Sequence, residues 1–164
     1  MSKPHWSRKL RALGACDDAV KWAATQPSYA EAWETCQRGD WLLWLLGRVA
    51  GPFGSPSHRE IVGAVSACAR TALPIFEAAV PGDGRVRACL DLLDRYAGGE
   101  VVSPEQIQAA AGAAWVAAGA ASAAAWSDVA TRTASASGAA TRPAALAHCA
   151  DIVRTKAKRP GLGE

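Results

Sequence analysis

Apolar residues recur every three or four positions along most of this chain, which is the spacing of one face of an α-helix. The pattern is clear over residues 7–25 and again over residues 85–96. Breakers such as Gln26-Pro27 and Gly98-Gly99 separate the periodic stretches. The sequence predicts seven helices and no strand, covering about residues 7–25, 29–37, 41–48, 57–79, 85–96, 104–135 and a last stretch from 141.

Three tetrapeptides have the composition of a capping box, in which a Ser oxygen accepts a bond from a backbone N–H and an acidic or amide side chain returns one. They are Ser28-Tyr29-Ala30-Glu31, Ser57-His58-Arg59-Glu60 and Ser103-Pro104-Glu105-Gln106. Asp40 is placed to cap the helix at 41–48, and a kink is expected at Pro74 within the helix at 57–79. Most helix starts are therefore predicted from local chemistry.

The helix at 41–48 is apolar all round, so we expect it to be buried on every side. The chain contains 38 Ala, many of them in the helix at 104–135, and small faces of this kind let helices approach closely. The seven Trp must then supply much of the bulk of the core. These features predict an all-α, single-domain bundle over residues 1–164, with a basic tail frayed from about residue 156.

Residues 106–127 carry no charge, and a stretch of this length could cross a bilayer. It consists mainly of Ala, Gly and Ser, with Trp115 and Trp126 on one face of the helix, and Ala contributes almost nothing to insertion. We therefore expect a buried helix here and no membrane span.

The net charge of +3 is too small to indicate a nucleic-acid-binding protein. Residues 1–11 carry +4 and residues 154–164 carry +3, which leaves −4 on the body between them. Basic ends could contact phosphate or an anionic membrane surface, but solvated termini that aid solubility are the simpler interpretation. We expect neither nucleic acid nor membrane as a partner.

The five cysteines, at positions 16, 36, 68, 89 and 149, are odd in number and contain no CxxC pair. A disulfide framework or a zinc knuckle is therefore not indicated. Each cysteine falls at an apolar position of a predicted helix, where a free thiol behaves as a small hydrophobe. Free cysteines fit a reducing compartment, and the N-terminus lacks the apolar region of a secretory signal, so the expected location is the cytoplasm.

No catalytic motif is recognisable, because the chain has no P-loop, no GxSxG, no HExxH and no dinucleotide fingerprint. The three His are far apart in sequence. His148 and Cys149 are adjacent on a helix, so their directions diverge by about 100° and they do not face one metal. We expect no metal, no cofactor and no enzymatic activity.

Charged side chains bracket the apolar helix at 41–48 and recur near two other helices. With the tryptophans of that helix they form the first candidate site: Arg38, Asp40, Trp41, Trp44, Arg48, Arg70, Asp151 and Arg154. One interpretation is structural, with Asp40 or Asp151 receiving Arg70, because charges near buried segments usually need partners. The other is a ligand- or partner-facing cluster, where Arg supplies forked donors and Trp supplies stacking area.

Acidic residues on the predicted helices at 7–25 and 85–96 form a second candidate, a face for a protein partner. They are Asp17, Asp18, Asp91 and Asp94. An inhibitor of a basic nuclease would favour such a face, whereas the mild positive charge of the whole chain suits that target poorly.

Residues 38–48, Arg-Gly-Asp-Trp-Leu-Leu-Trp-Leu-Leu-Gly-Arg, resemble the signature of a family of bacterial and phage immunity proteins associated with polymorphic toxin systems. Three further segments resemble that family in the right order: residues 67–70, the turn at 96–108 into the Ala-rich helix, and residues 149–154. The resemblance extends from about Leu13 to Arg154. It implies an all-helical, non-enzymatic protein that binds and neutralises a toxin.

Three functions stay open. A protein-binding module that occludes a toxin or an enzyme predicts an exposed patch of Trp or acidic side chains. A small-ligand or nucleotide-binding protein predicts a concave site where Arg38, Arg48 and Arg70 converge with Trp residues. A self-associating structural protein predicts a flat small-residue face. We favour the first, as a monomer or homodimer, over the other two, and an enzyme is a distant fourth.

Overall fold

The computed structural model describes residues 5–113 and 137–162, and every regular element in those ranges is a helix. The helices are α1 (Ser7–Ala12), α2 (Asp17–Ala24), α3 (Tyr29–Thr35), α4 (Gly39–Val49), α5 (Pro56–Arg70), α6 (Leu73–Ala79), α7 (Arg85–Ala97) and α9 (Ser137–Lys156). Residues 104–113 are also helical. The all-α class predicted from the periodicity is confirmed, with about the number of helices expected.

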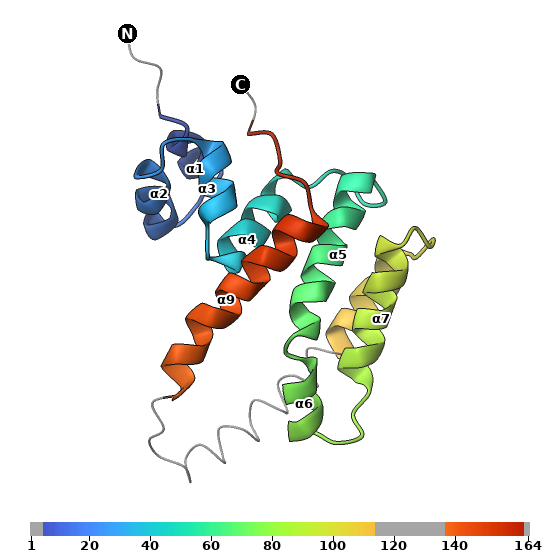
Figure 1. Cartoon of the computed structure of the whole chain (residues 1–164). Coiled ribbons are helices and arrows are strands. Elements are labelled where there is room, and N and C mark those ends of the chain that lie inside the picture. Colours follow the sequence, from blue (N-terminus) through green and yellow to red (C-terminus); the bar gives the residue numbers. More distant parts are fainter. Residues whose placement is uncertain (1–4, 114–136, 163–164) are drawn as a thin grey trace.

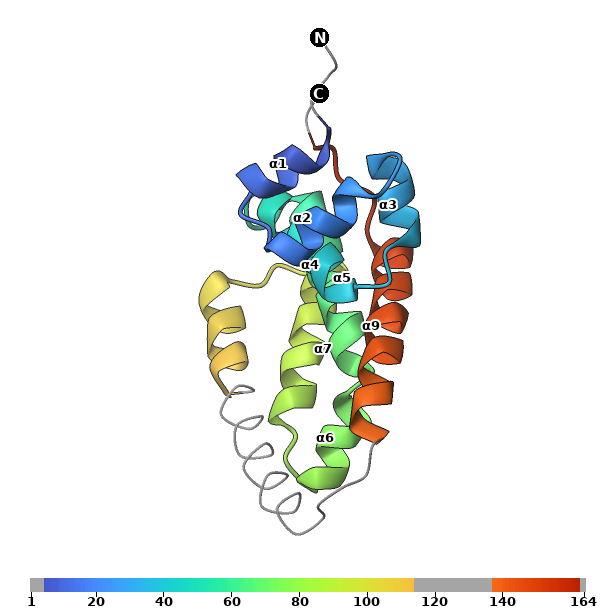
Figure 2. The same cartoon turned by 90° about the vertical axis from the view of Figure 1, so that its left-hand side faces the viewer.

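Three helices, α9, α5 and α7, run side by side and form the long body of the molecule (Figure 1). Helix α5 lies in the middle, because it packs against α7 on one side and against α9 on the other. Helix α4 crosses α9, and α1, α2 and α3 gather around α4 at one end of the body (Figure 2). Helix α6 lies at the opposite end.

The main apolar core joins the end formed by α1–α4 to the body. Its buried side chains come from six helices and include Leu10, Val20, Trp33, Leu45 and Val153. Burial of this apolar surface is the dominant force that holds the short helices in place, since none of α1–α3 is long enough to be stable alone.

The close crossing of α4 and α9 depends on Gly39. A Cβ atom at this buried position would lie 2.6 Å from Cys149 Cβ and 2.8 Å from the backbone nitrogen of Ala150. Only glycine fits such a contact, because real Cβ atoms do not approach other heavy atoms so closely. The backbone of α9 therefore lies directly against the first turn of α4.

The predicted helix at 7–25 is wrong as a single element, because the chain breaks at Gly14. This residue has φ of +86°, and its N–H donates to the Arg11 carbonyl while the Ala15 N–H donates to the Leu10 carbonyl. These two bonds form a Schellman motif, which ends α1 and redirects the chain into α2. The apolar spacing continues across the break, which is why periodicity did not reveal it.

The predicted helix at 57–79 is also two elements. Helix α5 begins earlier than expected, because Ser55 rather than Ser57 is the cap and accepts a bond from the His58 N–H at 3.3 Å. The chain bends by 47° between α5 and α6, so the kink expected at Pro74 is a helix boundary. Proline suits the first turn of a helix, where its missing N–H has no intrahelical partner to lose.

Other local predictions are confirmed. The Ser28 oxygen accepts from the Glu31 N–H, and Ser103 and Gln106 exchange both bonds of a capping box. Asp40, however, does not cap α4; it lies in the first turn and pairs with Arg38. Helix α4 is not buried on every side either, since its Trp side is only half-buried.

At the C-terminal end, α9 begins at Ser137 rather than at 141 and contains Pro143. Helix α9 ends at Lys156, near the point where the tail was expected to fray, and the described residues 157–162 beyond it contact other parts of the chain. There the Tyr29 hydroxyl donates to the Pro160 carbonyl at 2.8 Å, and Ala157 is buried. The remainder of the helix predicted at 104–135, with Trp115 and Trp126, lies outside the described residues.

Within the described ranges, no helix alone combines the length and the apolar composition needed to cross a membrane. Helices α5 and α6 meet that test only as a bent pair.

Candidate functional site

Helices α1–α4 enclose a cavity of about 460 Å³ at one end of the molecule. Aromatic side chains from α2, α3, α4 and the N-cap of α1 dominate its wall: Trp6, Trp22, Tyr29, Trp33, Trp41 and Trp44. Small residues such as Gly14, Ala15 and Ala32 complete the wall and leave the space open between the rings. The short helices therefore surround a mostly apolar cavity.

The rings in the wall are tilted against one another rather than stacked face to face. Trp22 and Trp41 have centroids 5.9 Å apart with 54° between their planes, and Trp6 and Tyr29 are 5.5 Å apart at 48°. Tilted pairs of this kind are favourable because the edge of one ring meets the face of the other. The indole nitrogen of Trp6 is buried and has no hydrogen-bond partner among the described residues.

Arg38 and Asp40 lie at the edge of the cavity and form a forked ion pair. Arg38 Nε and Nη2 donate to the two carboxylate oxygens of Asp40 at 2.8 and 2.6 Å. The guanidinium also lies 4.3 Å from the ring centroid of Trp41. The hydrogen bonds from Arg38 hold the pKa of the Asp40 carboxyl below its ordinary range, so both partners stay charged at neutral pH.

Arg48, near the other end of α4, does not line the cavity but lies beside two residues that do. Its guanidinium lies 5.5 Å from the ring centroid of Trp44, and Nη2 lies 4.0 Å from where a Cβ on Gly14 would be. Within the part of the chain that the structure describes, Arg48 makes no ion pair. The structure therefore places only part of the first candidate cluster at the cavity. Arg48 lies beside the cavity, and four members line it: Arg38, Asp40, Trp41 and Trp44.

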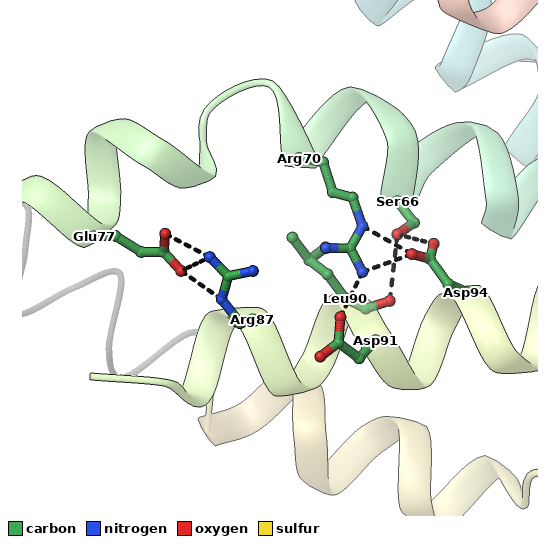
Figure 3. A network of polar contacts seen from close by, with 7 residues as sticks. All are labelled: Ser66, Arg70, Glu77, Arg87, Leu90, Asp91 and Asp94. Carbon is green, nitrogen blue, oxygen red and sulfur yellow. Dashed lines mark hydrogen bonds and ion pairs between the residues drawn. The ribbon is translucent and has the colours of Figure 1, made fainter. Parts of the chain in front are cut away.

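Arg70 is elsewhere, between α5 and α7. Its Nε donates to Asp94 at 2.8 Å and its Nη2 donates to Asp91 at 2.6 Å, as Figure 3 shows. Ser66 donates to the other oxygen of Asp94 at 2.6 Å. The expectation that Asp40 or Asp151 receives Arg70 is therefore wrong, because the packing of α5 on α7 places two nearer carboxylates opposite the guanidinium.

This polar network is on the surface. The side chains of Arg70, Asp91 and Asp94 keep 32%, 57% and 46% of their exposure. The hydrogen bonds that Arg70 donates to Asp91 and Asp94 raise its pKa, so it stays charged at any physiological pH. Glu77 and Arg87 form a second forked pair farther along, which links α6 to α7 (Figure 3).

A groove of about 720 Å³ lies beside Arg70 and Asp94, along the line where α5 meets α7. Its lining comprises Gly54, Pro56, Arg59, Glu60, Gly63, Ala67, Arg70, Asp94, Ala97, Gly98 and Lys156. Small residues form much of this surface and charged residues of both signs accompany them. The groove is more polar than the cavity at α1–α4, and no aromatic side chain lines it.

Arg154 joins α9 to the C-terminal end of α3, and Asp151 pairs with it on α9. Arg154 Nη1 donates to the carbonyls of Trp33 and Cys36 at 3.2 and 2.8 Å, and Nη2 donates to Asp151 at 2.6 Å. The guanidinium thus satisfies carbonyls at the C-terminal end of α3, which no intrahelical bond can reach. Both side chains therefore make their contacts within the chain, and Asp151 pairs with Arg154 rather than with Arg70.

The four acidic residues expected to form one face lie on two different helices. Asp17 and Asp18 lie in the first turn of α2 and are exposed, whereas Asp91 and Asp94 are on α7 and bind Arg70. No group of three or more His, Cys, Asp or Glu that could hold a metal ion occurs in residues 5–113 and 137–162.

A family model described as Imm-5 like putative immunity protein matches residues 52–151. The chain belongs to this immunity protein family. The matched range covers α5, α6, α7 and three quarters of α9, so it contains the groove residues except Lys156. The family resemblance stated from the sequence is confirmed, although residues 38–48, which suggested it first, precede the matched range. No curated protein and no solved structure matches the chain.

In this immunity protein the start of the matched range at residue 52 separates the aromatic cavity from the groove. Every residue that lines the aromatic cavity lies between Trp6 and Leu45, before the matched range. Sequence reasoning found Trp41 and Trp44 but missed Trp6, Trp22, Tyr29 and Trp33. The signal that could have found them is the presence of an aromatic residue on each short helix between breakers, from Trp6 to Trp44.

Proposed function

We propose that this immunity protein neutralises a toxin by binding it at the groove between α5 and α7, without a chemical step. The observation that supports this proposal is the position of the groove, which lies almost wholly within the matched residues. A surface used for the family's shared function belongs in the part of the chain that the family shares.

The floor of the groove suits close approach by a partner. Gly63 and Ala97 are so near that a Cβ atom on Gly63 would lie 3.3 Å from the Ala97 Cβ. Together with Ala67 they leave a shallow surface with little side chain above it. A protruding element of a toxin could reach the backbone level of both helices there.

The charged residues of the groove are already positioned. Arg70 is held by two carboxylates, and Arg59 donates to the carbonyls of Gly54 and Glu100 at 3.2 and 3.0 Å. Ordering these side chains in advance reduces the entropy lost on association. Arginine is also enriched among the residues that contribute most to protein–protein affinity. Because Arg70 stays charged, it suits a role in binding better than a role as a proton donor or acceptor in catalysis.

We also place the protein in the cytoplasm. The five cysteines are all free, which is the state that a reducing compartment maintains. In the cytoplasm the immunity protein would bind the toxin before the toxin reaches its target.

The test is binding to, and protection from, any toxin domain whose gene is found beside the gene of this protein. Ala67→Glu places a bulky charge in the groove, and Ala30→Glu makes the same change on exposed α3, away from it. We expect Ala67→Glu to weaken binding at least about tenfold by calorimetry and to abolish growth protection, while Ala30→Glu behaves as wild type. Circular dichroism confirms that both variants fold. A folded Ala67→Glu protein that binds and protects normally would refute the proposed surface.

A further inference from the structure

We propose that the cavity between α1, α2, α3 and α4 is a second, separate site, which binds a small planar aromatic molecule carrying an anionic group. This inference does not rest on the proposed toxin surface, because the two sites share no lining residue. It assigns a function to the N-terminal helices, which precede the residues that the immunity family matches.

The size of the cavity fits a small molecule. Its volume of about 460 Å³ falls within the range of about 300–1,000 Å³ that is typical of ligand sites. Its wall is built from four separate helices, so a molecule inside would be contacted from several directions. A mostly apolar wall with a few polar groups at the edge is the usual composition of such a site.

The wall selects for flat, aromatic shape. Trp22 and Trp41 meet at 54° and Trp6 and Tyr29 at 48°, so neither pair is stacked in parallel. Rings in tilted pairs keep faces and edges that a third aromatic ring can contact. Small wall residues, among them Ala15, leave the space that this third ring would occupy.

The charges at the edge select for an anion. Arg38 uses Nε and Nη2 to bind Asp40, which leaves its Nη1 without a hydrogen bond among the described residues. Arg48 makes neither an ion pair nor a hydrogen bond within those residues. Arg38 thus lies over the ring of Trp41 with its charge paired, whereas Arg48 lies over the ring of Trp44 with no carboxylate paired to it among the described residues.

Asp40 is the only acidic residue within ion-pair distance of Arg38 or Arg48 among the described residues. Asp17 and Asp18 follow the cavity residue Cys16, and neither forms an ion pair with Arg38 or Arg48 among the pairs within 4.0 Å. A carboxylate or phosphate on the ligand could therefore bind Arg48 while its ring lies in the cavity. Arg48 would be the residue that determines the preference for an anion.

The proposal is tested with three probes that share one ring and differ in charge: indole-3-acetate, indole and tryptamine. Each is titrated into the full-length ¹⁵N-labelled protein, and affinity is measured from the indole N–H resonances of tryptophan and from calorimetry. We expect indole-3-acetate to bind about tenfold tighter than indole and tryptamine to bind weakest. The Arg48→Gln variant should bind indole as wild type and lose the preference for indole-3-acetate.

Two controls separate this site from the groove and from misfolding. Ala67→Glu, which blocks the groove, should leave all three affinities unchanged, so the two proposals can fail independently. Arg48→Lys keeps the charge and should keep the preference for the anion, even if Arg48→Gln proves unstable.

The reactivity of Cys16 gives an independent measure of ligand binding, because this cysteine is exposed and lines the cavity. Indole-3-acetate should slow the reaction of Cys16 with N-phenylmaleimide, with mass spectrometry reporting the modified residue. The proposal is overturned if no probe binds at millimolar concentration. It is equally overturned if tryptamine binds as tightly as indole-3-acetate, or if the anion preference survives in folded Arg48→Gln.

Discussion

Replacing Gly39 by alanine tests whether the α4–α9 crossing is as tight as the structure indicates. The added Cβ would lie 2.6 Å from Cys149 Cβ, 2.8 Å from Ala150 N and 2.9 Å from the Cys149 carbonyl carbon. Two of these three atoms belong to the backbone of α9 and cannot rotate away. The two helices must therefore separate to accept one methyl group.

The magnitude follows from two opposing effects. Overpacking a tight core contact costs about 1–3 kcal/mol, and the backbone atoms involved place this contact near the upper end. Alanine in a helix also gains about 0.5–1 kcal/mol over glycine. The net expectation for Gly39→Ala is a loss of about 2 kcal/mol in the free energy of unfolding. At about 2–4 °C per kcal/mol for a chain of this size, Tm should fall by about 4–8 °C.

Gly47→Ala is the matched control, because it makes the same change on the same helix. A Cβ there would have no heavy atom within 4 Å, and the position is exposed. This variant should gain about 0.5–1 kcal/mol. Urea unfolding followed by circular dichroism and by tryptophan fluorescence measures both variants. A Gly39→Ala protein as stable as wild type would refute the argument, as would equal losses at both positions.

Three further predictions rest on single features of the structure. Tyr96→Phe should cost about 1–2 kcal/mol in urea unfolding, because the buried hydroxyl accepts from the Gly54 N–H at 2.7 Å and its loss leaves that donor unpaired; no change would refute the role of the hydroxyl. The Arg38 hydrogen bonds lower the pKa of Asp40 below 3.8, so the pair stabilises the fold above about pH 4 and loses this contribution as the pH falls through the lowered pKa. The stabilities of wild type and Arg38→Met, measured by urea unfolding, should therefore converge in acid, and a gap that persists would contradict the prediction. Ellman's reagent should modify Cys16 first in the native protein, checked by peptide mass mapping, because it is the exposed cysteine; faster labelling elsewhere would show that the cavity end opens.

Sequence reasoning succeeded where the interaction spans a few residues. The caps at Ser28 and Ser103 bond to backbone groups three residues away, and the stop at Gly98-Gly99 is a local turn with Gly99 at φ of +106°. Such bonds depend on the local residues and hardly on the rest of the fold. The same reasoning failed at Gly14, where a helix with unbroken apolar spacing and two helices joined at a glycine are both compatible with the pattern.

The amino-acid sequence by itself determined the helical class, most of the helix ends, the positions of the breakers and the family to which the chain belongs. The tertiary structure decided which charges meet, since Arg70 had several carboxylates available and binds the two that α7 presents. It also decided that six aromatic residues carried by four short helices and their caps line one cavity. The physical reason is range: helix and cap preferences act over about four residues, whereas these contacts depend on how whole helices pack against each other.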